Sequence, residues 1–237
     1  GIHKLDALTR LLEVEPFDAM LVFARTKQST VELVEKLEAR GFAAAALNGD
    51  ILQAQRERTI AALKTGKVDI VVATDVAARG IDVDDITHVI NYQLPDEPEI
   101  YTHRSGRTGR AGKSGISMVI VSKSEVRKIK SIERIIKKQF EKKEIPDGME
   151  ICEVQLMSLA DKIHNTEVNH EIDKYLTSIN DLFEDTTKDE LIKKFFSVEF
   201  TRFFNYYQKS KNLNASESSD GGRDYNQNSN DSRYFIN

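Results

Sequence analysis

The chain has 237 residues, of which 40% are hydrophobic and 30% are charged, and its formal net charge is −4. This length and composition are typical of a globular protein with one sizeable core and a smaller second domain, and they exclude a disordered or fibrous chain. A single cysteine, Cys152, excludes an internal disulfide framework and any multi-cysteine metal site, and it indicates the reducing environment of the cytoplasm.

The two parts of the chain carry opposite charge. Residues 1–145 contain 24 Lys and Arg against 21 Asp and Glu, a net of +3, whereas residues 146–237 contain 10 against 17, a net of −7. No apolar run approaches the roughly 20 residues that crossing a membrane requires, so we expect no membrane association. The change of charge falls at Ile145-Pro-Asp-Gly, which indicates a domain junction. We therefore predict two domains and a tail, at residues 1–147, 148–211 and 212–237.

The first domain alternates between two kinds of apolar pattern. Short apolar runs predict buried strands at residues 19–23, 42–47, 68–73, 86–91 and 115–121. Helical spacing predicts helices at residues 4–14, 29–40 (with Ser29 as the capping residue), 53–64 and 99–107. This alternation indicates an α/β domain with a parallel sheet and helices on both faces. Since functional loops gather at the carboxyl ends of parallel strands, the architecture brings together Arg25, Thr26, residues 48–50, Thr74 and Asp75.

A long helix is predicted at residues 122–144. Its apolar positions lie on one face, and lysines and arginines occupy much of the rest. A solvated amphipathic helix that packs on the sheet is the favoured interpretation. A surface that contacts nucleic acid is the alternative, because such side chains neutralise phosphates.

From residue 150 onward the pattern predicts an all-helical domain. Helical spacing recurs at residues 155–164, 168–183 and 188–209, and the last segment is rich in Phe and Tyr. A unit of roughly 55 residues buries that much apolar surface poorly on its own. These side chains therefore either fill the domain's core or pack against a second copy, and we favour a C2 dimer through residues 150–210. The tail, poor in apolar residues, is expected to be disordered.

Two polar segments stand out against this framework. Residues 72–83 follow a buried strand, and residues 103–110 contain three arginines spaced three apart, with glycines between them. In a helix this spacing would bring Arg104, Arg107 and Arg110 to one face. Convergent guanidinium groups beside glycines suit a phosphate. A solvated arginine run is the alternative for the second segment taken alone.

The residues of both segments resemble a known family. Ala73-Thr-Asp-Val-Ala-Ala-Arg-Gly-Ile-Asp82 and His103-Arg-Ser-Gly-Arg-Thr-Gly-Arg110 are similar to motifs V and VI of DEAD-box RNA helicases. Residues 21–26 resemble motif IV, and Asn48-Gly-Asp50 with Gln53-Ala-Gln-Arg56 resembles the glycine-aspartate turn and QxxR motif. The first domain thus looks like the second RecA-like lobe of such an enzyme.

The resemblance implies roles for individual residues. Thr26, Gly49, Arg56 and Thr74 would hold the phosphates and sugars of single-stranded RNA without reading its bases. Asp82 and Gly80 would bind the ATP ribose, and Arg107 and Arg110 would reach the γ-phosphate as the catalytic arginines. His103 and Asp75 would couple the two lobes. No metal ligand is implied in this chain.

The first lobe's signatures are missing from these residues. Neither a G-x-x-x-x-G-K-[ST] phosphate loop nor an Asp-Glu-Ala-Asp sequence occurs, so the Mg²⁺ ligands of an ATP-dependent enzyme would lie in that lobe. We expect these 237 residues alone to hydrolyse no ATP. The helices after residue 150 look like the dimerisation domain of bacterial cold-shock helicases. The strongly basic RNA-binding domain that often follows it does not occur within these 237 residues, and truncation is the alternative to its absence.

Two other functions compete with an RNA helicase. The chain could be a non-catalytic interaction module, although Arg107 and Arg110 argue against a pure binder. It could equally be part of a motor that acts on DNA, which the form of both motifs disfavours.

Overall fold

The computed structural model describes residues 2–83, 85–110, 112–208, 213–214 and 232–236, the side chains of the last five and of residues 2 and 3 excepted. It contains two compact units. Residues 1–145 and 213–237 form the first, which we call the lobe, and residues 146–212 form the second, which we call the helical unit. The chain therefore leaves the lobe after Ile145 and returns to it at Leu213, whereas the sequence predicted a single passage near residue 147.

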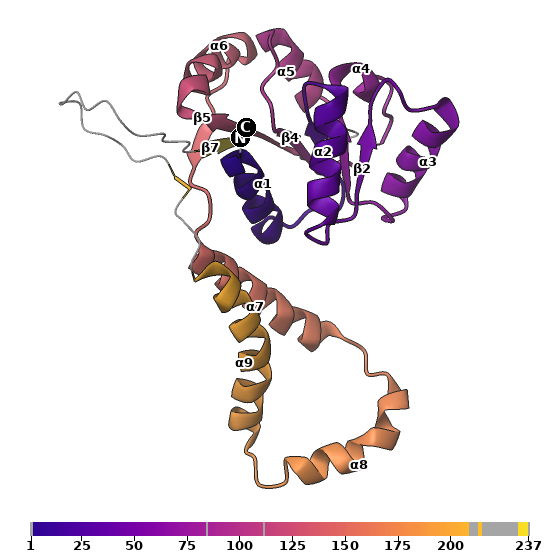
Figure 1. Cartoon of the computed structure of the whole chain (residues 1–237), viewed down its shortest axis with the longest axis vertical. Coiled ribbons are helices and arrows are strands. Elements are labelled where there is room, and N and C mark those ends of the chain that lie inside the picture. Colours follow the sequence, from indigo (N-terminus) through magenta and orange to yellow (C-terminus); the bar gives the residue numbers. More distant parts are fainter. Residues whose placement is uncertain (1, 84, 111, 209–212, 215–231, 237) are drawn as a thin grey trace, which may run out of the picture. The chain divides into compact units, whose positions relative to one another are not determined.

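A seven-stranded sheet forms the centre of the lobe (Figure 1). Five strands run parallel, with the register Met20↔Ile70 and Met20↔His88 around the central strand, and all five lie where the apolar runs predicted them. A sixth and a seventh strand extend one edge, with one of them antiparallel to both of its neighbours. The spatial order is β2 (Ala44–Leu47), β3 (Ile70–Ala73), β1 (Met20–Phe23), β4 (His88–Asn91), β5 (Ile116–Ser122), β7 (Ser232–Ile236) and β6 (Glu141–Lys143).

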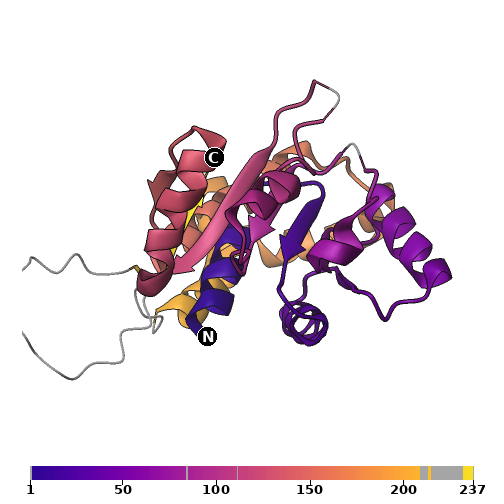
Figure 2. The same cartoon turned by 90° about the horizontal axis from the view of Figure 1, so that it is seen from above.

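Helices cover both faces of this sheet, as the alternation predicted. Successive residues of a strand point to opposite faces, and in β1 Met20 and Val22 join one apolar cluster whereas Leu21 and Phe23 join another. The first cluster includes α1 (Ile2–Val14) and α2 (Lys27–Glu38), and Figure 2 shows α2 end-on beside the sheet. The opposite face carries α3 (Gln53–Lys64), α4 (Asp75–Ala78), α5 (Pro98–Ser105) and α6 (Val126–Ile136).

The helix predicted over residues 122–144 is confirmed only at residues 126–136, and its predicted extension to residue 144 is wrong. A short 3₁₀ turn, η1 (Lys123–Glu125), precedes α6, and α6 ends at Lys137, whose backbone is left-handed with φ 54°. The Glu133 side chain accepts a hydrogen bond from the Phe140 amide at 2.9 Å, which holds the reversed chain. Phe140 is buried edge-on against Tyr101. Phe140 has the spacing of the apolar face of the predicted helix, but the chain reverses before Phe140 and buries its ring outside any helix.

The expected disorder of residues 212–237 is only partly addressed by the structure. Residues 215–231 lie outside the described ones. Leu213 is buried in the core of the lobe, Asn214 exchanges two hydrogen bonds with the backbone of Ile145, and Ser232–Ile236 forms β7. For this last segment the prediction of disorder is wrong. The Tyr-Phe-Ile run has high strand propensity, and it pairs with the otherwise open edge of β5.

The helical unit consists of α7 (Gly148–Asn165), a 3₁₀ turn η2 (His170–Ile172), α8 (Asp173–Leu182) and α9 (Lys188–Tyr207). Asp147 and Glu150 form a capping box at the start of α7, and Thr187 caps α9. Within this unit α7 packs along α9, whereas α8 stands away from both (Figure 1). In the described part of the chain, no helix combines the length and apolar character that spanning a membrane requires.

Candidate functional site

The predicted phosphate-binding residues gather at one edge of the sheet. Thr26 follows β1, Gly49 follows β2 and Thr74 follows β3. Since β2, β3 and β1 are neighbours in the sheet and all run parallel, their carboxyl ends lie side by side. The fold therefore brings these three residues to one edge, as the sequence predicted.

Two of these residues are helix caps. The Thr26 hydroxyl accepts a hydrogen bond from the Ser29 amide at 3.1 Å, so α2 begins after Thr26 and the prediction of Ser29 as its cap is wrong. A cap residue must carry a side-chain oxygen that accepts from the amide three residues later, and Thr26 meets this requirement as well as Ser29 does. The Thr74 hydroxyl caps α4 through the Ala77 amide at 3.4 Å. Thr26 is exposed, whereas Thr74 is buried.

Arg56 and Gly49 have neighbours that the sequence did not indicate. The Arg56 guanidinium donates to the carbonyl oxygens of Ala77 at 2.5 Å and Arg79 at 2.7 Å. It therefore holds the backbone of the segment 73–82 as well as offering charge at the site. Exposed Gly49 lies beside Lys27, which pairs with Asp50 and so joins the loops after β1 and β2.

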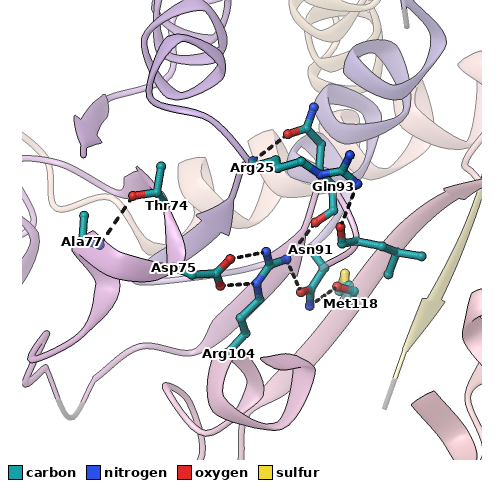
Figure 3. A network of polar contacts seen from close by, with 9 residues as sticks. Arg25, Thr74, Asp75, Ala77, Asn91, Gln93, Arg104 and Met118 are labelled. Carbon is teal, nitrogen blue, oxygen red and sulfur yellow. Dashed lines mark hydrogen bonds and ion pairs between the residues drawn. The ribbon is translucent and has the colours of Figure 1, made fainter. Parts of the chain in front are cut away.

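Arg104 lies at the centre of a buried network (Figure 3). Its guanidinium contacts both Asp75 carboxylate oxygens, through Nε at 2.6 Å and an Nη at 2.8 Å. Its other Nη donates to the Asn91 side chain at 2.9 Å and to the Gln93 carbonyl at 2.7 Å. The guanidinium carbon also lies 4.8 Å from the centre of the Phe23 ring. Only 1% of Arg104 is exposed.

The predicted convergence of Arg104 with Arg107 and Arg110 is therefore wrong. Helix α5 ends at Ser105, and Gly106 terminates it, so the helical spacing of three residues holds only to that point. Arg104 faces the sheet, and the later two arginines lie in the turn that follows. The sequence offered one usable signal for this network, since Asn91 ends β4, Asp75 lies two residues after the end of β3, and both accept hydrogen bonds.

The turn after α5 is held in close contact with the following loop. The Thr108 hydroxyl donates to the Ile86 carbonyl oxygen. Gly109 has a positive φ of 67°, and a Cβ atom on Gly115 would overlap the Thr108 hydroxyl and the Gly109 amide. These contacts fix the backbone between Arg107 and Arg110, so the two side chains leave the lobe from a defined position.

Arg107 and Arg110 form the electropositive part of the site. Arg110 donates to the Gly106 carbonyl at 3.0 Å and lies 3.5 Å from the highly exposed carboxylate of Asp82. The half-buried Arg107 guanidinium has no hydrogen bond or ion pair with any residue that the structure describes. Burial and the neighbouring charge of Arg110 both lower the pKa of Arg107. Gly80 has a φ of 74°, which favours glycine and leaves open space before Asp82.

The two residues predicted to couple lobes differ in their surroundings. His103 is exposed on α5, whereas Asp75 is engaged within the lobe by Arg104. Among the described residues, no group of three or more His, Cys, Asp and Glu side chains could hold a metal ion. The site thus offers cations, hydroxyls and backbone amides, which are the groups that bind phosphates and sugars.

The chain matches two family models. The model described as "Helicase conserved C-terminal domain" matches residues 3–112. The model described as "Probable ATP-dependent RNA helicase, helical domain" matches residues 151–208. The ATP-dependent RNA helicase DeaD of Mycobacterium tuberculosis is 54% identical over 163 residues, which cover 69% of this chain and 29% of that relative. The chain therefore spans less than a third of the length of this relative.

Solved structures of DEAD-box proteins resemble the lobe. The Escherichia coli protein SrmB, solved with regulator of ribonuclease activity A, is 36% identical with a TM-score of 0.56, over 58% of this chain and 81% of that one. The Saccharomyces cerevisiae protein Dbp5, solved with RNA and ADP BeF3, is 33% identical with a TM-score of 0.52, over 55% of this chain and 35% of that one.

Proposed function

Since the chain belongs to the DEAD-box RNA helicase family and matches its carboxyl-terminal lobe, we propose that it is the second lobe of an ATP-dependent RNA helicase. The whole enzyme would remodel RNA by closing two RecA-like lobes on ATP and on a single RNA strand. This chain would contribute part of each binding site, and the first lobe of the same protein would contribute the remainder.

The observation that carries this proposal is the state of Arg107. A guanidinium that is half buried and has no partner among the described residues is costly unless an anion completes its surroundings. Arg110 adds a second positive charge beside it, which lowers the pKa of Arg107 further and disfavours any cationic ligand. The γ-phosphate of ATP fits this position, and Asp82, exposed beyond Gly80, is free to accept hydrogen bonds from the ribose.

The RNA-facing residues lie at the neighbouring strand ends. Thr26 and Gly49 are exposed there, and the amino-terminal amides of α2 lie beside Thr26. Such amides and hydroxyls hold phosphates without reading bases. Arg56 supports this surface from below by fixing the backbone after Thr74. The expected ligand is therefore a single strand of RNA held by its backbone.

Arg104 supports a physical link between the two halves of the site. Asp75 directly follows RNA-facing Thr74, and Arg104 lies three residues before ATP-facing Arg107. The bidentate Asp75–Arg104 contact therefore fixes the two segments to each other. ATP hydrolysis supplies the free energy of such an enzyme, with the Mg²⁺ ligands in the first lobe. The role of this chain is to position its arginines so that they neutralise charge on the γ-phosphate.

The Arg107→Ala substitution in the full-length protein tests this proposal. We expect the RNA-stimulated ATPase rate to fall by about 10³-fold, because a transition-state arginine is lost, while RNA affinity without nucleotide changes little. The matched control is Arg58→Ala, which removes an exposed arginine on α3 that has no ion pair among the described residues. Equal rates for the two variants would contradict the ATP assignment. Stimulation of the wild type by DNA as strongly as by RNA would contradict the choice of substrate.

We also propose that the protein is a homodimer through residues 150–210 and that it is cytoplasmic. The exposed apolar side chains of the helical unit support the dimer, and the single buried Cys152 is typical of a reducing compartment. Sedimentation velocity at micromolar concentration distinguishes the dimer from the monomer. A strictly monomeric chain would exclude this arrangement.

A further inference from the structure

The helix α6 and the turn after it carry a dense positive charge. Six cations lie within residues 127–138, and all six are exposed: Arg127, Lys128, Lys130, Arg134, Lys137 and Lys138. The only acid in that stretch is Glu133. We refer to the four cations nearest the turn, Lys130, Arg134, Lys137 and Lys138, as the α6 basic surface.

In the part of the chain that the structure describes, these cations form a cluster without a counter-charge, whereas several other cations of the lobe are paired. Elsewhere, carboxylates pair with Lys4, Arg25, Lys27, Arg40, Arg104, Arg110 and Lys113. Within the described residues, the α6 basic surface has no ion pair and no side-chain hydrogen bond. Glu133 uses a carboxylate oxygen to accept from the Phe140 amide. The surface therefore retains a positive potential that attracts an anionic partner.

The geometry of the surface is rigid and repetitive. Ile129 and Ile132 are buried against the sheet, which fixes the rotation of α6. Lys130 and Arg134 lie four residues apart on one face of α6, and Lys137 and Lys138 follow directly in the turn that ends the helix. Lys137 is the one non-glycine residue in the described part of the chain with a positive φ, a conformation that an L side chain adopts only when its surroundings impose it.

The α6 basic surface borders a shallow hollow. Its volume is about 400 Å³, and its lining consists of charged and amide-bearing side chains: Lys130, Glu133, Arg134, Lys137, Lys138 and Gln139. A protein partner would require an apolar anchor at the centre of its interface, and no lining residue supplies one. A row of phosphates requires only cations at regular spacing. The chemistry of the hollow therefore favours a nucleic-acid backbone over an acidic protein.

The surface is separate from the site described above. Glu141, at the start of β6, is level with Ile236 of β7, which is level with Met118 near the start of β5. Because β5 and β6 are both antiparallel to β7, β6 runs in the direction of β5, and the turn at residues 137–140 lies on the amino-terminal side of Glu141. Thr74 and Asp75 lie at the carboxyl-terminal edge. An RNA strand bound at the carboxyl-terminal edge does not by itself reach the α6 basic surface, so only a longer RNA could contact both.

We propose that the α6 basic surface is a second RNA-binding surface, which holds the sugar-phosphate backbone of RNA extending beyond the strand bound at the carboxyl ends of β1–β3. This inference rests on the proposed function, because it assigns a further contact to the same substrate. Binding here is independent of sequence and sensitive to salt.

The test compares two labelled RNAs, a single-stranded 10-mer and the same 10-mer joined to a hairpin. Fluorescence anisotropy is measured with the full 237-residue chain over a series of salt concentrations. The variant combines Lys130→Gln, Arg134→Gln and Lys138→Gln. The control combines Lys36→Gln, Lys64→Gln and Lys67→Gln, which remove the same charge from exposed lysines that have no ion pair among the described residues.

We expect the α6 variant to bind the hairpin RNA about tenfold more weakly at low salt, with a salt slope reduced by roughly 2, as the loss of three phosphate contacts requires. Its affinity for the 10-mer and both affinities of the control should stay within about twofold. Because all six side chains are exposed, the variants should melt like the wild type.

Four results would overturn the inference. An unchanged affinity of the α6 variant for the hairpin RNA excludes the contact, and the proposed function then stands alone. An equal loss of affinity for the 10-mer and for the hairpin RNA would mean that the cations attract RNA in general and do not contact the extension. A labelled polyglutamate peptide that binds the wild type as tightly as the hairpin RNA, and binds the α6 variant weakly, assigns the surface to an acidic protein. If the wild type binds neither RNA, the proposed function fails as well.

Discussion

The lobe and the helical unit solve the problem of burying apolar side chains in opposite ways. In the lobe, four large apolar side chains are exposed among the described residues, whereas in the much shorter helical unit fourteen are. Few residues of the helical unit are fully buried, among them Ile151, Cys152 and Tyr207. The lobe therefore buries most of its large apolar side chains, whereas the helical unit leaves many exposed, which supports the proposed dimer.

Polar contacts show the same difference. In the lobe, ion pairs such as Arg104–Asp75 and Arg40–Asp6 join residues far apart in the sequence. In the helical unit, the ion pairs within the described residues join positions only three or four apart in the sequence, as in Lys193–Asp189. Such local pairs stabilise helices but do not fix how helices pack. Long-range ion pairs therefore help to specify how the lobe packs, whereas the ion pairs of the helical unit do not specify how its helices pack.

The largest effect should come from the buried network of the lobe. The Arg104→Met substitution removes the cation from Asp75 and leaves Asn91 and the Gln93 carbonyl without their donor. Breaking a buried pair in this way costs about 4 kcal/mol of unfolding free energy. Urea unfolding followed by hydrogen exchange of the lobe's strands measures this cost without mixing in the helical unit.

The matched control is Arg40→Met, which breaks the ion pair with Asp6. The side chains of Arg40 and Asp6 are each about one-third exposed. That change should cost less than about 1 kcal/mol. Equal destabilisation by the two substitutions would mean that the Arg104 network does not specify the lobe.

The second prediction concerns the apolar surface of the helical unit. Phe195 is 54% exposed on α9 and lies edge-on to Phe196. If a second copy covers this surface, Phe195→Ala removes an aromatic anchor and weakens the dimer by about 2 kcal/mol, or roughly thirtyfold in dissociation constant. Sedimentation equilibrium over a concentration series measures the change.

Leu52 provides the control within the lobe. It is 76% exposed, so Leu52→Ala should leave both association and stability within about 0.5 kcal/mol of the wild type. A dimer that Phe195→Ala leaves intact and Leu52→Ala weakens would reverse the comparison between the two units.

The sequence predicted the lobe's architecture well because its signals are local. The five apolar runs that predicted strands and the apolar spacing of α3 depend on residues close together in the chain, and all of these elements are found. Residues at strand ends, such as Thr26 and Thr74, could be placed together because parallel strands end at a common edge.

The remaining features depend on contacts between distant segments. Arg104 continues the spacing of Arg107 and Arg110, but its partners come from other strands, and only the folded sheet brings Asn91 beside it. The end of α6 depends on the hydrogen bond from the Phe140 amide to Glu133 and on burial of the Phe140 ring. No local pattern contains that information. The roles of the site residues toward ATP and RNA remain predictions.

The third prediction uses the buried histidine of the lobe. His88 is 4% exposed, and its Nε2 has no hydrogen-bond partner among the residues that the structure describes. Burial lowers the pKa of His88, and the charge of Asp18 opposes this only in part. Below pH 6.5 the unfolded chain therefore takes up a proton before the folded lobe does. The unfolding free energy of the lobe should therefore decrease as the pH is lowered below 6.5, by at most about 1.4 kcal/mol per pH unit.

The substitution His88→Gln removes this titration and should flatten the difference in stability between pH 7 and pH 5.5. Denaturant unfolding at several pH values measures it. An unaltered pH dependence in the His88→Gln lobe would assign the effect to other groups.

The smallest effect compares one substitution in both units. Thr26 caps α2 and Thr187 caps α9, each through the amide three residues later, so either Thr→Ala change removes the same hydrogen bond and costs about 1 kcal/mol locally. Because Leu33 and Leu37 anchor α2 in the core, Thr26→Ala should lower the stability of the whole lobe. Thr187→Ala should instead fray only the first turn of α9, with faster hydrogen exchange there and an unchanged lobe. If Thr187→Ala also lowered the stability of its whole unit, the helical unit would unfold as cooperatively as the lobe, which would contradict the comparison.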